Sequence, residues 1–396
     1  MIPATEQDVV AAVAEAVAAK EPLLVQGHGT KSAMLRPVQA ARTLSTSGLS
    51  GIGLYAPKEL IISARAGTPL TEVEDTLAAA GQYLIAEPPD LSALLGSNGM
   101  PQTLGGIVAT NLSGPRRVAW GAMRDHVMGV RAVTGRAEII RSGGRVLKNV
   151  TGLDLCKLLT GSHGTLGIIT EITLKVLPAP EATGTLVLPG LDAVKAVAVL
   201  SDALGSPYGV SGAAWLPAEA ASRINAPVPS GQSVALIRIE EFSPSVTYRL
   251  DRLRDQFDQP NATILDTATS RSLWKAVRDA RPLAPGEAIW RVSVRPSAGP
   301  RVLEAVAPLG VSGFLDWGGG LVWLSGPAEF PVQAAIEKSV AATGGAWTLM
   351  RAPEGFRGSV RAVPDEAPAL ARIRQGVKSA MDPAGILNPG RIYAGL

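Results

Sequence analysis

The chain of 396 residues contains one cysteine, Cys156, and three histidines, His28, His126 and His163. A single cysteine excludes an intrachain disulfide, a cysteine-ligated iron–sulfur cluster and a cysteine-type zinc site. The histidines all lie in the first half of the sequence and far from one another. We therefore expect no metal site in this chain.

The chain also lacks a large excess of charge of either sign, because it has 37 Lys and Arg residues and 34 Asp and Glu residues, which gives a net charge of +3. The basic residues are scattered, which argues against a nucleic-acid-binding surface. No apolar run is long enough to span a bilayer, and Met1–Glu6 shows no basic region followed by an apolar one, as a signal peptide would. We expect a soluble cytoplasmic protein and leave open a peripheral association with the inner membrane through a partner.

Glycine is abundant, with 43 residues, and it gathers in two segments, Thr103–Asn111 and Gly161–Glu171, that flank apolar runs. Glycine lets other atoms approach the backbone closely, and exposed N–H groups suit a phosphate or a flat ring. Glycines also make bulges and turns, but two clusters with this intervening sequence favour a ligand site. The hydrophobic fraction of 46% and the chain length predict two domains.

A third glycine-containing segment, Gln26–Ser32, follows a short apolar run, Leu23–Val25, that we predict to be a strand. It is not a Walker A loop, because Thr30 stands where that motif has a glycine directly before Lys-Ser. It is not a Rossmann fingerprint either, because Ser32 replaces the third glycine. We interpret it as a phosphate loop of another kind.

Together these segments resemble the FAD-binding domain of the vanillyl-alcohol oxidase / p-cresol methylhydroxylase flavoproteins (the PCMH type). Within that superfamily they are most similar to the FAD-binding E subunits of bacterial glycolate oxidases. The resemblance is dense over Leu23–Pro178, weaker afterwards, and returns near the C-terminus at Asp382–Arg391. It implies FAD as the cofactor. Two residues depart from the family's phosphate loop, Gln26 for a basic residue and His28 for a glycine.

Some relatives attach the flavin covalently through a histidine in this loop, but His28 stands at a different offset. The resemblance therefore implies non-covalent FAD. It places the phosphate loop on the pyrophosphate, Thr103–Asn111 along the isoalloxazine, and Gly161–Ile169 at the adenine and ribose. Loop arginines such as Arg116 and Arg117 are usually solvated.

The cofactor-binding residues that the resemblance implies come from five segments of the chain. They are Gly27, His28, Gly29, Thr30, Lys31, Ser32, Pro88, Thr103, Gly105, Gly106, Thr110, Asn111, Ser113, Gly161, Gly164, Gly167, Ile169, Asn388 and Arg391.

The sequence after Pro180 alternates strand-like and helix-like segments in the order β-α-β-β-α-β, once from Thr183 and again from Ala288. Two such ferredoxin-like halves can form one antiparallel sheet with helices on one face. The predicted fold is α+β. It comprises an FAD-binding domain of two subdomains (1–180), a cap (181–352) and a C-terminal segment (353–396) that returns to the first domain.

Oxidation of a 2-hydroxy acid needs a cation for the carboxylate and a base for the hydroxyl proton. We take Arg291 and Arg351 as catalytic candidates because both lie on predicted cap strands. Alternation along a strand places Arg291, Ser293 and Arg295 on one face. The alternative is that this face is solvated.

Related D-2-hydroxy acid dehydrogenases use a histidine-rich segment that this cap lacks, so the catalytic set is incomplete. Three hypotheses remain. The chain is an FAD-binding subunit of a glycolate oxidase complex, oxidising glycolate to glyoxylate with a D-type FAD subunit and an F-type iron–sulfur subunit. Alternatively it is a self-sufficient 2-hydroxy acid dehydrogenase, or a non-redox assembly protein. The missing histidines argue against the second hypothesis, and the intact glycine segments against the third.

Overall fold

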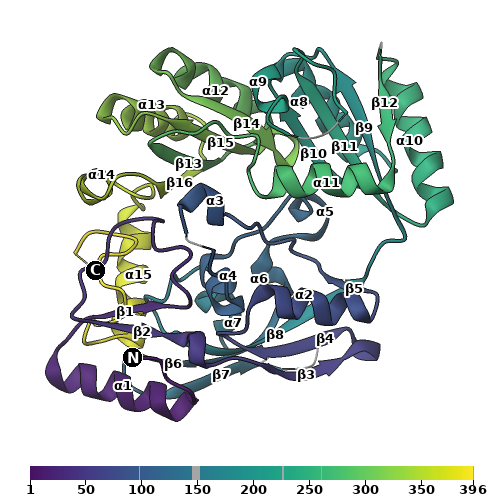
Figure 1. The fold of residues 1–396 in the computed structure, drawn as a ribbon. Coiled ribbons are helices and arrows are strands. Elements are labelled where there is room, and N and C mark those ends of the chain that lie inside the picture. Colours follow the sequence, from purple (N-terminus) through teal and green to yellow (C-terminus); the bar gives the residue numbers. More distant parts are fainter. Residues whose placement is uncertain (98, 145–151, 225–226, 260, 396) are drawn as a thin grey trace.

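The computed structural model describes residues 1–97, 99–144, 152–224, 227–259 and 261–395, and Figure 1 labels its helices and strands. The chain forms three sheets: a parallel pair, a six-stranded antiparallel sheet and an eight-stranded antiparallel sheet. The predicted α+β class and the antiparallel cap are confirmed. Among the described residues, no helix is both long and apolar enough to cross a membrane.

The N-terminal helix α1 (Glu6–Ala19) begins with the predicted capping box, in which Asp8 N–H donates to Thr5 Oγ1 (3.2 Å) and Thr5 N–H to Asp8 Oδ2 (2.9 Å). Its buried valines pack on the parallel pair β1 (Leu23–Gln26) and β2 (Arg42–Ser45). The C-terminal segment joins this layer, because Leu387 pairs with Leu23.

The six-stranded sheet forms the rest of the first region. Its strand order is β3-β4-β8-β6-β7, and β5 also pairs with β8, so β8 is the central strand. Its strands are β3 (Ile52–Ala56), β4 (Ile61–Arg65), β5 (Gln82–Leu84), β6 (Val127–Val133), β7 (Ile139–Gly143) and β8 (Ile168–Pro178). Its helices are α2 (Leu70–Ala79), α3 (Ser92–Leu95), α4 (Leu104–Thr110), α5 (Arg117–Trp120), α6 (Met123–His126) and α7 (Leu155–Leu159), with 3₁₀ turns at Thr46–Gly48 and Pro57–Glu59.

Two local expectations for this region were wrong. The spacing of Thr71 and Glu74 predicts a capping box, but it does not form, because the N-cap of α2 is Pro69, two residues before Thr71, and Leu70 N–H donates to Gln102 O (2.9 Å) of a distant loop. Strand β7 was expected over 137–146, but Ala137 is in a turn with φ of +59° and β7 starts at Ile139. The expected residues 145 and 146 lie outside the described part of the chain.

The cap sheet has the strand order β12-β9-β11-β10-β14-β15-β13-β16. Each half runs β-α-β-β-α-β, and the halves meet where Trp215 of β10 pairs with Leu315 of β14. The first half comprises β9 (Ala182–Pro189), α8 (Ala193–Gly205), β10 (Val210–Leu216), α9 (Ala218–Ala221), β11 (Val234–Glu241), α10 (Ser243–Phe257), β12 (Thr263–Leu265) and α11 (Thr267–Arg278).

The second half comprises β13 (Ala288–Ser293), α12 (Gly299–Val306), β14 (Ser312–Asp316), η5 (Trp317–Gly319), β15 (Leu321–Gly326), α13 (Phe330–Ala341) and β16 (Ala346–Arg351), with 3₁₀ turns at Pro296–Ala298 and Ala307–Leu309. Helices α14 (Glu354–Ser359) and α15 (Pro368–Met381) follow. Figure 1 shows α8, α12 and α13 on the outer face of the cap sheet, and α5 and α11 between this sheet and the first region.

A buried cluster of four charges ties the inner face of the cap to the first region. Arg238 of β11 donates two N–H groups to the Glu87 carboxylate (2.9 and 3.0 Å), and Arg116 grips Glu240 of β11 through two more (2.9 and 2.7 Å). Burial alone would raise the pKa of Glu240, but the guanidinium groups of Arg238 and Arg116 lower it to about 2. We call this cluster the charge lock.

We predict that Arg238→Met lowers the free energy of unfolding by about 3–5 kcal/mol, because it leaves Glu87 buried without its main partner. Urea unfolding followed by circular dichroism measures this loss. Arg42→Met removes an arginine paired at the surface with Glu15 and Glu21, and it should change the midpoint little. Equal midpoints for the wild-type protein and Arg238→Met would show that the charge lock does not stabilise the fold.

Candidate functional site

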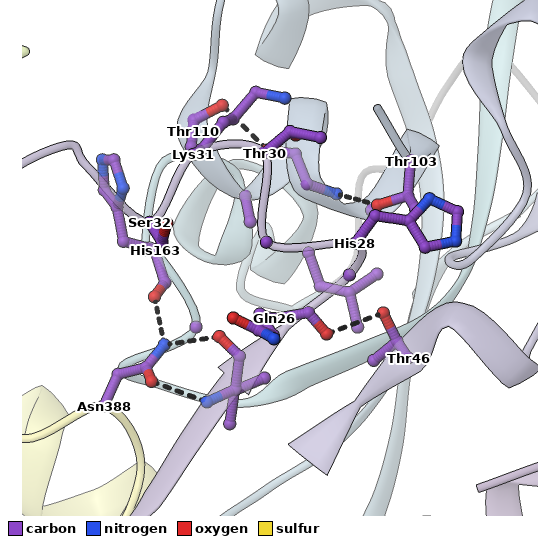
Figure 2. A pocket seen from close by; sticks show the side chains of 18 of the residues that line it. Gln26, His28, Thr30, Lys31, Ser32, Thr46, Thr103, Thr110, His163 and Asn388 are labelled. Carbon is purple, nitrogen blue, oxygen red and sulfur yellow. Dashed lines mark hydrogen bonds between the residues drawn. The ribbon is translucent and has the colours of Figure 1, made fainter. Parts of the chain in front are cut away.

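Three segments that are distant in the sequence line a partly open cavity (Figure 2). The loop after β1 forms one wall, the start of α4 a second, and the loop before β8 a third. Asn388 and Arg391 of the C-terminal segment close the cavity. The predicted residues that line it are Gly27, His28, Gly29, Thr30, Lys31, Ser32, Thr103, Gly105, Gly106, Thr110, Gly164, Gly167, Ile169, Asn388 and Arg391.

Four predicted residues lie outside this lining: Pro88, Asn111, Ser113 and Gly161. Two of them have their side chains engaged elsewhere. Asn111 Oδ1 accepts from Arg124 N–H (3.1 Å), and Ser113 Oγ accepts from Met123 N–H (2.8 Å). These side chains fix the loop after α4.

The cavity has six further lining residues that the sequence motifs did not indicate. Leu24, Val25, Gln26, Thr46, Ala109 and His163 also face the cavity. Most of them flank residues that were predicted, so a wider window around each motif would have found them. Thr46 follows β2, whose pairing with β1 no local pattern revealed.

The phosphate loop presents unpaired donors to the cavity. The backbone N–H groups of residues 28–31 make no hydrogen bond with any residue that the structure describes. Arg391 holds the other side of this loop by donating to the carbonyls of Lys31 (2.9 Å) and Ser32 (3.2 Å). Gly29 has φ of +74°, which places successive N–H groups on one concave side. Such a nest binds anions.

The charged side chains of the lining are all basic. Lys31 Nζ donates to Gln102 Oε1 (2.9 Å), and burial lowers the pKa of Lys31 to about 8, although Asp90 counteracts this. Burial also lowers the pKa of Arg391 to about 10, helped by Arg357. Both groups keep their charge at neutral pH, and the lining residues that the structure describes include no Asp or Glu. The cavity therefore suits an anionic ligand such as a pyrophosphate.

His163 brings a neutral ring to the same cavity. Burial, together with the charge of Arg391, lowers the pKa of His163 to about 3. Its backbone has φ of +52°, and its N–H donates to Ala109 O (2.8 Å). His163 is therefore a neutral polar residue in the wall of the cavity.

Asn388 joins three segments at the base of the cavity (Figure 2). Its Oδ1 accepts from Val25 N–H (2.7 Å), and its Nδ2 donates to Val25 O (3.1 Å) and to His163 O (2.8 Å). Every polar atom of the side chain is thus used by the protein. Asn388 shapes the cavity by holding its walls together.

The two neighbouring glycines of α4 have different reasons to be glycine. A Cβ on Gly105 would lie 2.8 Å from Ala66 Cβ and 2.9 Å from Ala66 O, so Gly105 is required by packing. A Cβ on Gly106 would meet Thr103 Oγ1 at 3.2 Å, a tight contact that a small shift of the Thr103 side chain relieves, and Lys31 Nζ at 4.0 Å, so packing restricts Gly106 less than Gly105. The empty space beside Gly106 belongs to the cavity.

Neither catalytic candidate lines this cavity. Arg351 donates to the carbonyls of Leu94 and Gly286, which ties β16 to α3 and to the loop before β13. Arg291 lies on the inner face of the cap against the rings of Trp317 and Trp323. The predicted common face holds for Arg291 and its strand neighbour Ser293, whereas Arg295 is exposed beyond the end of β13.

We predict that Gly106→Val gives folded protein whose FAD affinity falls on the order of tenfold or more, because the added methyl groups occupy cofactor space. Fluorescence titration of the apoprotein with FAD measures this. Gly105→Val is the matched control and should instead lower the free energy of unfolding by about 1–3 kcal/mol through overpacking. Unchanged FAD affinity in Gly106→Val would remove this residue from the site.

The residues present fit FAD, since an anion nest, two cations and a glycine-bared wall meet in one cavity. The comparisons with known proteins agree. A family model described as "FAD binding domain" matches residues 1–143. Two solved structures share the fold. Alkyldihydroxyacetonephosphate synthase has a TM-score of 0.69 at 16% identity, over 98% of this chain and 76% of its own. The 4-ethylphenol oxidase from Gulosibacter chungangensis has a TM-score of 0.71 at 14% identity, over 100% of this chain and 89% of its own.

Among curated proteins, glycolate oxidase subunit GlcE of Escherichia coli (strain K12) is 35% identical over 387 residues, which are 97% of this chain and 96% of that protein. Glycolate oxidase subunit GlcD of Bacillus subtilis is 43% identical over 99 residues, 25% of this chain and 20% of that protein. The chain therefore belongs to the FAD-binding oxidoreductases of the p-cresol methylhydroxylase / vanillyl-alcohol oxidase family.

Proposed function

We propose that this chain is the FAD-carrying subunit of a glycolate oxidase-type complex, which oxidises glycolate to glyoxylate. The observation that carries this proposal is the extent of the similarity to GlcE, which runs through 97% of this chain and 96% of that protein. The similarity to GlcD is confined to a quarter of the chain. An E-type subunit is therefore favoured over a D-type one.

The division of labour that we propose follows the strand orders. Residues 1–180 form the FAD-binding domain with its two subdomains, and residues 181–352 form the cap from two ferredoxin-like halves. Residues 353–396 return to the first domain. The β-α-β-β-α-β order of each half and the pairing of Leu387 with Leu23 support this division.

Bound FAD supplies the redox chemistry of such an enzyme by accepting electrons from the substrate. The chain's own residues would hold it. The N–H groups of residues 28–31 and the charge of Lys31 suit the pyrophosphate, and Arg391 fixes the loop that carries them. The other predicted cofactor residues that line the cavity form its walls.

The proposed partners follow from what the chain lacks. Its single cysteine denies it an iron–sulfur relay of its own, so electrons must leave to another protein or acceptor. A D-type FAD subunit and an F-type iron–sulfur subunit would complete the path. The complex would work in the cytoplasm, at the inner membrane through its partners.

We predict that the FAD is bound without a covalent link. The His28 ring is occupied, since its Nδ1 lies 2.7 Å from Pro101 O, and the buried Cys156 lies outside the cavity lining. Acid precipitation of the FAD-loaded protein should leave the yellow colour in the supernatant. Flavin that stays with the washed pellet would contradict this.

We also predict that the isolated chain does not oxidise glycolate efficiently without its partner subunits. Rapid anaerobic mixing of the FAD-loaded chain with glycolate, followed by the flavin absorbance, tests this. The reconstituted complex is the positive control and should bleach within its turnover time. Reduction at catalytic rates in the isolated chain would overturn the subunit proposal and favour a self-sufficient dehydrogenase.

A further inference from the structure

Two guanidinium groups approach one indole ring between the cap and the first region. The Cζ of Arg117, from α5, lies 4.2 Å from the Trp317 ring centroid, and the Cζ of Arg291, from β13, lies 4.7 Å from it. Trp317 itself is fixed, because its Nε1–H donates to Gly114 O (3.0 Å). Trp323 adds a second ring 5.9 Å from Arg291 Cζ.

Both guanidinium groups lack an acceptor. Neither the Arg117 nor the Arg291 guanidinium group donates to a side chain or carbonyl, or pairs with a carboxylate, within the described ranges; each contacts only the indole rings. Burial and, to a lesser extent, the charge of Arg117 lower the pKa of Arg291 to about 10, although Asp316 counteracts this. The two cations thus repel each other in a partly dehydrated place. Holding them there costs stability unless an anion joins them.

Other buried arginines of this chain show what a purely structural arginine looks like. Arg238 has four donor contacts with Glu87 and Ser211, and Arg391 donates to three backbone carbonyls. Their N–H groups are consumed by the protein. The guanidinium N–H groups of Arg291 have no acceptor among the described residues, which is typical of a side chain that binds a ligand.

One acid lies close to each cation of this pair, Asp125 to Arg117 and Asp316 to Arg291. Asp316 is 2% exposed, and its Oδ1 accepts from Trp317 N–H (2.7 Å). Burial raises the pKa of Asp316 to about 7 against the lowering effects of the Trp317 N–H, Arg238 and Arg291. The charged groups that face it are Arg238 of β11, Arg291 of β13 and Glu87 of the first region.

We propose that Arg291 and Arg117 bind the carboxylate of a small organic acid beside Trp317, and that the ionisation of Asp316 controls its affinity. The identity of that acid, a 2-hydroxy acid or the oxo acid formed from it, rests on the proposed function. The site itself rests on the two free cations. The two oxygens of a carboxylate match the paired N–H donors of a guanidinium group. Two neighbouring cations also bind an anionic carboxylate better than a neutral ligand.

The location agrees with this assignment. Helix α4 lines the cofactor cavity from Gly105 to Thr110, and the segment that follows it contacts Trp317 through Gly114 O. A helix of its seven residues is about 10 Å long. The carboxylate site and the cofactor cavity are therefore near neighbours, joined by one short helix. Arg117 is exposed at its outer edge, which gives a ligand a way in.

Calorimetric titration of the FAD-loaded protein with oxalate, a carboxylate that a flavin cannot dehydrogenate, tests the site. We expect binding that weakens about tenfold or more in Arg291→Met and in Arg117→Gln. Arg295→Gln removes an exposed arginine just beyond the same strand and should bind oxalate as the wild-type protein does. No binding to the wild-type protein, or equal binding in all variants, would overturn the proposal.

The pH dependence gives an independent readout. Asp316 becomes negative as the pH rises through about 7, so oxalate should bind more weakly at pH 8 than at pH 6. Asp316→Asn removes that charge and should bind at pH 8 as tightly as at pH 6. A pH dependence that persists unchanged in Asp316→Asn would contradict the role of Asp316.

Stability separates a ligand site from a packing role. Arg291→Met deletes a cation without a partner, so its urea midpoint should equal or exceed that of the wild-type protein, in contrast to Arg238→Met. A midpoint that falls as far as in Arg238→Met, with oxalate binding retained, would make Arg291 a structural residue and overturn the proposal.

The test also separates this site from the proposed function. Arginine-dependent oxalate binding without glycolate turnover by the reconstituted complex would support the site and contradict the function. Glycolate turnover whose KM is unchanged in Arg291→Met and Arg117→Gln, with unchanged oxalate binding, would overturn the site and leave the function standing.

Discussion

The arrangement of the two large sheets depends on the charge lock of Arg238, Glu87, Arg116 and Glu240. Two cations meet two carboxylates, so the cluster is neutral, and the protein supplies nearly every hydrogen bond that its members need. A buried ion pair of this kind adds little stability compared with apolar packing, but it penalises every arrangement that separates the partners. It thereby fixes the position of the cap over the first region. The segment around Gly114 lies beside Glu87 and Arg116, because Gly114 N–H donates to Ala86 O. The same segment fixes Trp317, whose Nε1–H donates to Gly114 O.

The cofactor cavity depends on a second kind of constraint, closure by the end of the chain. Asn388 and Arg391 contribute few groups to a ligand, since the protein itself uses most of their donors and acceptors. Their role is to hold the walls: Asn388 joins β1 to the loop of His163, and Arg391 donates to the carbonyls of Lys31 and Ser32 in the phosphate loop. The N–H groups of residues 28–31 of that loop have no acceptor among the described residues. A motif near the C-terminus thus produces an anion site built near the N-terminus.

The sequence predicts the order of the cap elements well because apolar strand segments and amphipathic helices are local patterns; β10 has the bounds that its apolar run Val210–Leu216 predicts. The candidate site was predicted less completely, because what a side chain does depends on its distant neighbours. Leu70 donates to Gln102, which displaced the expected cap of α2. Gly105 and Gly106 look alike in the sequence, yet only the structure brings Ala66 against one of them. Arg291 and Arg351 both lie on cap strands, and nothing local reveals that two carbonyls engage Arg351 alone.

These contrasts give a physical criterion for function within one face of one sheet. The inner face of the cap carries three arginines, Arg238 on β11, Arg291 on β13 and Arg351 on β16. Two of them have their donors satisfied by carboxylates or carbonyls, so folding alone accounts for their presence. Arg291 has no such partner among the described residues, and a second cation faces it across an aromatic ring. Folding selects against that arrangement, since desolvation and repulsion both oppose it. A residue that the fold does not need, held where the fold resists it, is explained by a ligand that carries the opposite charge.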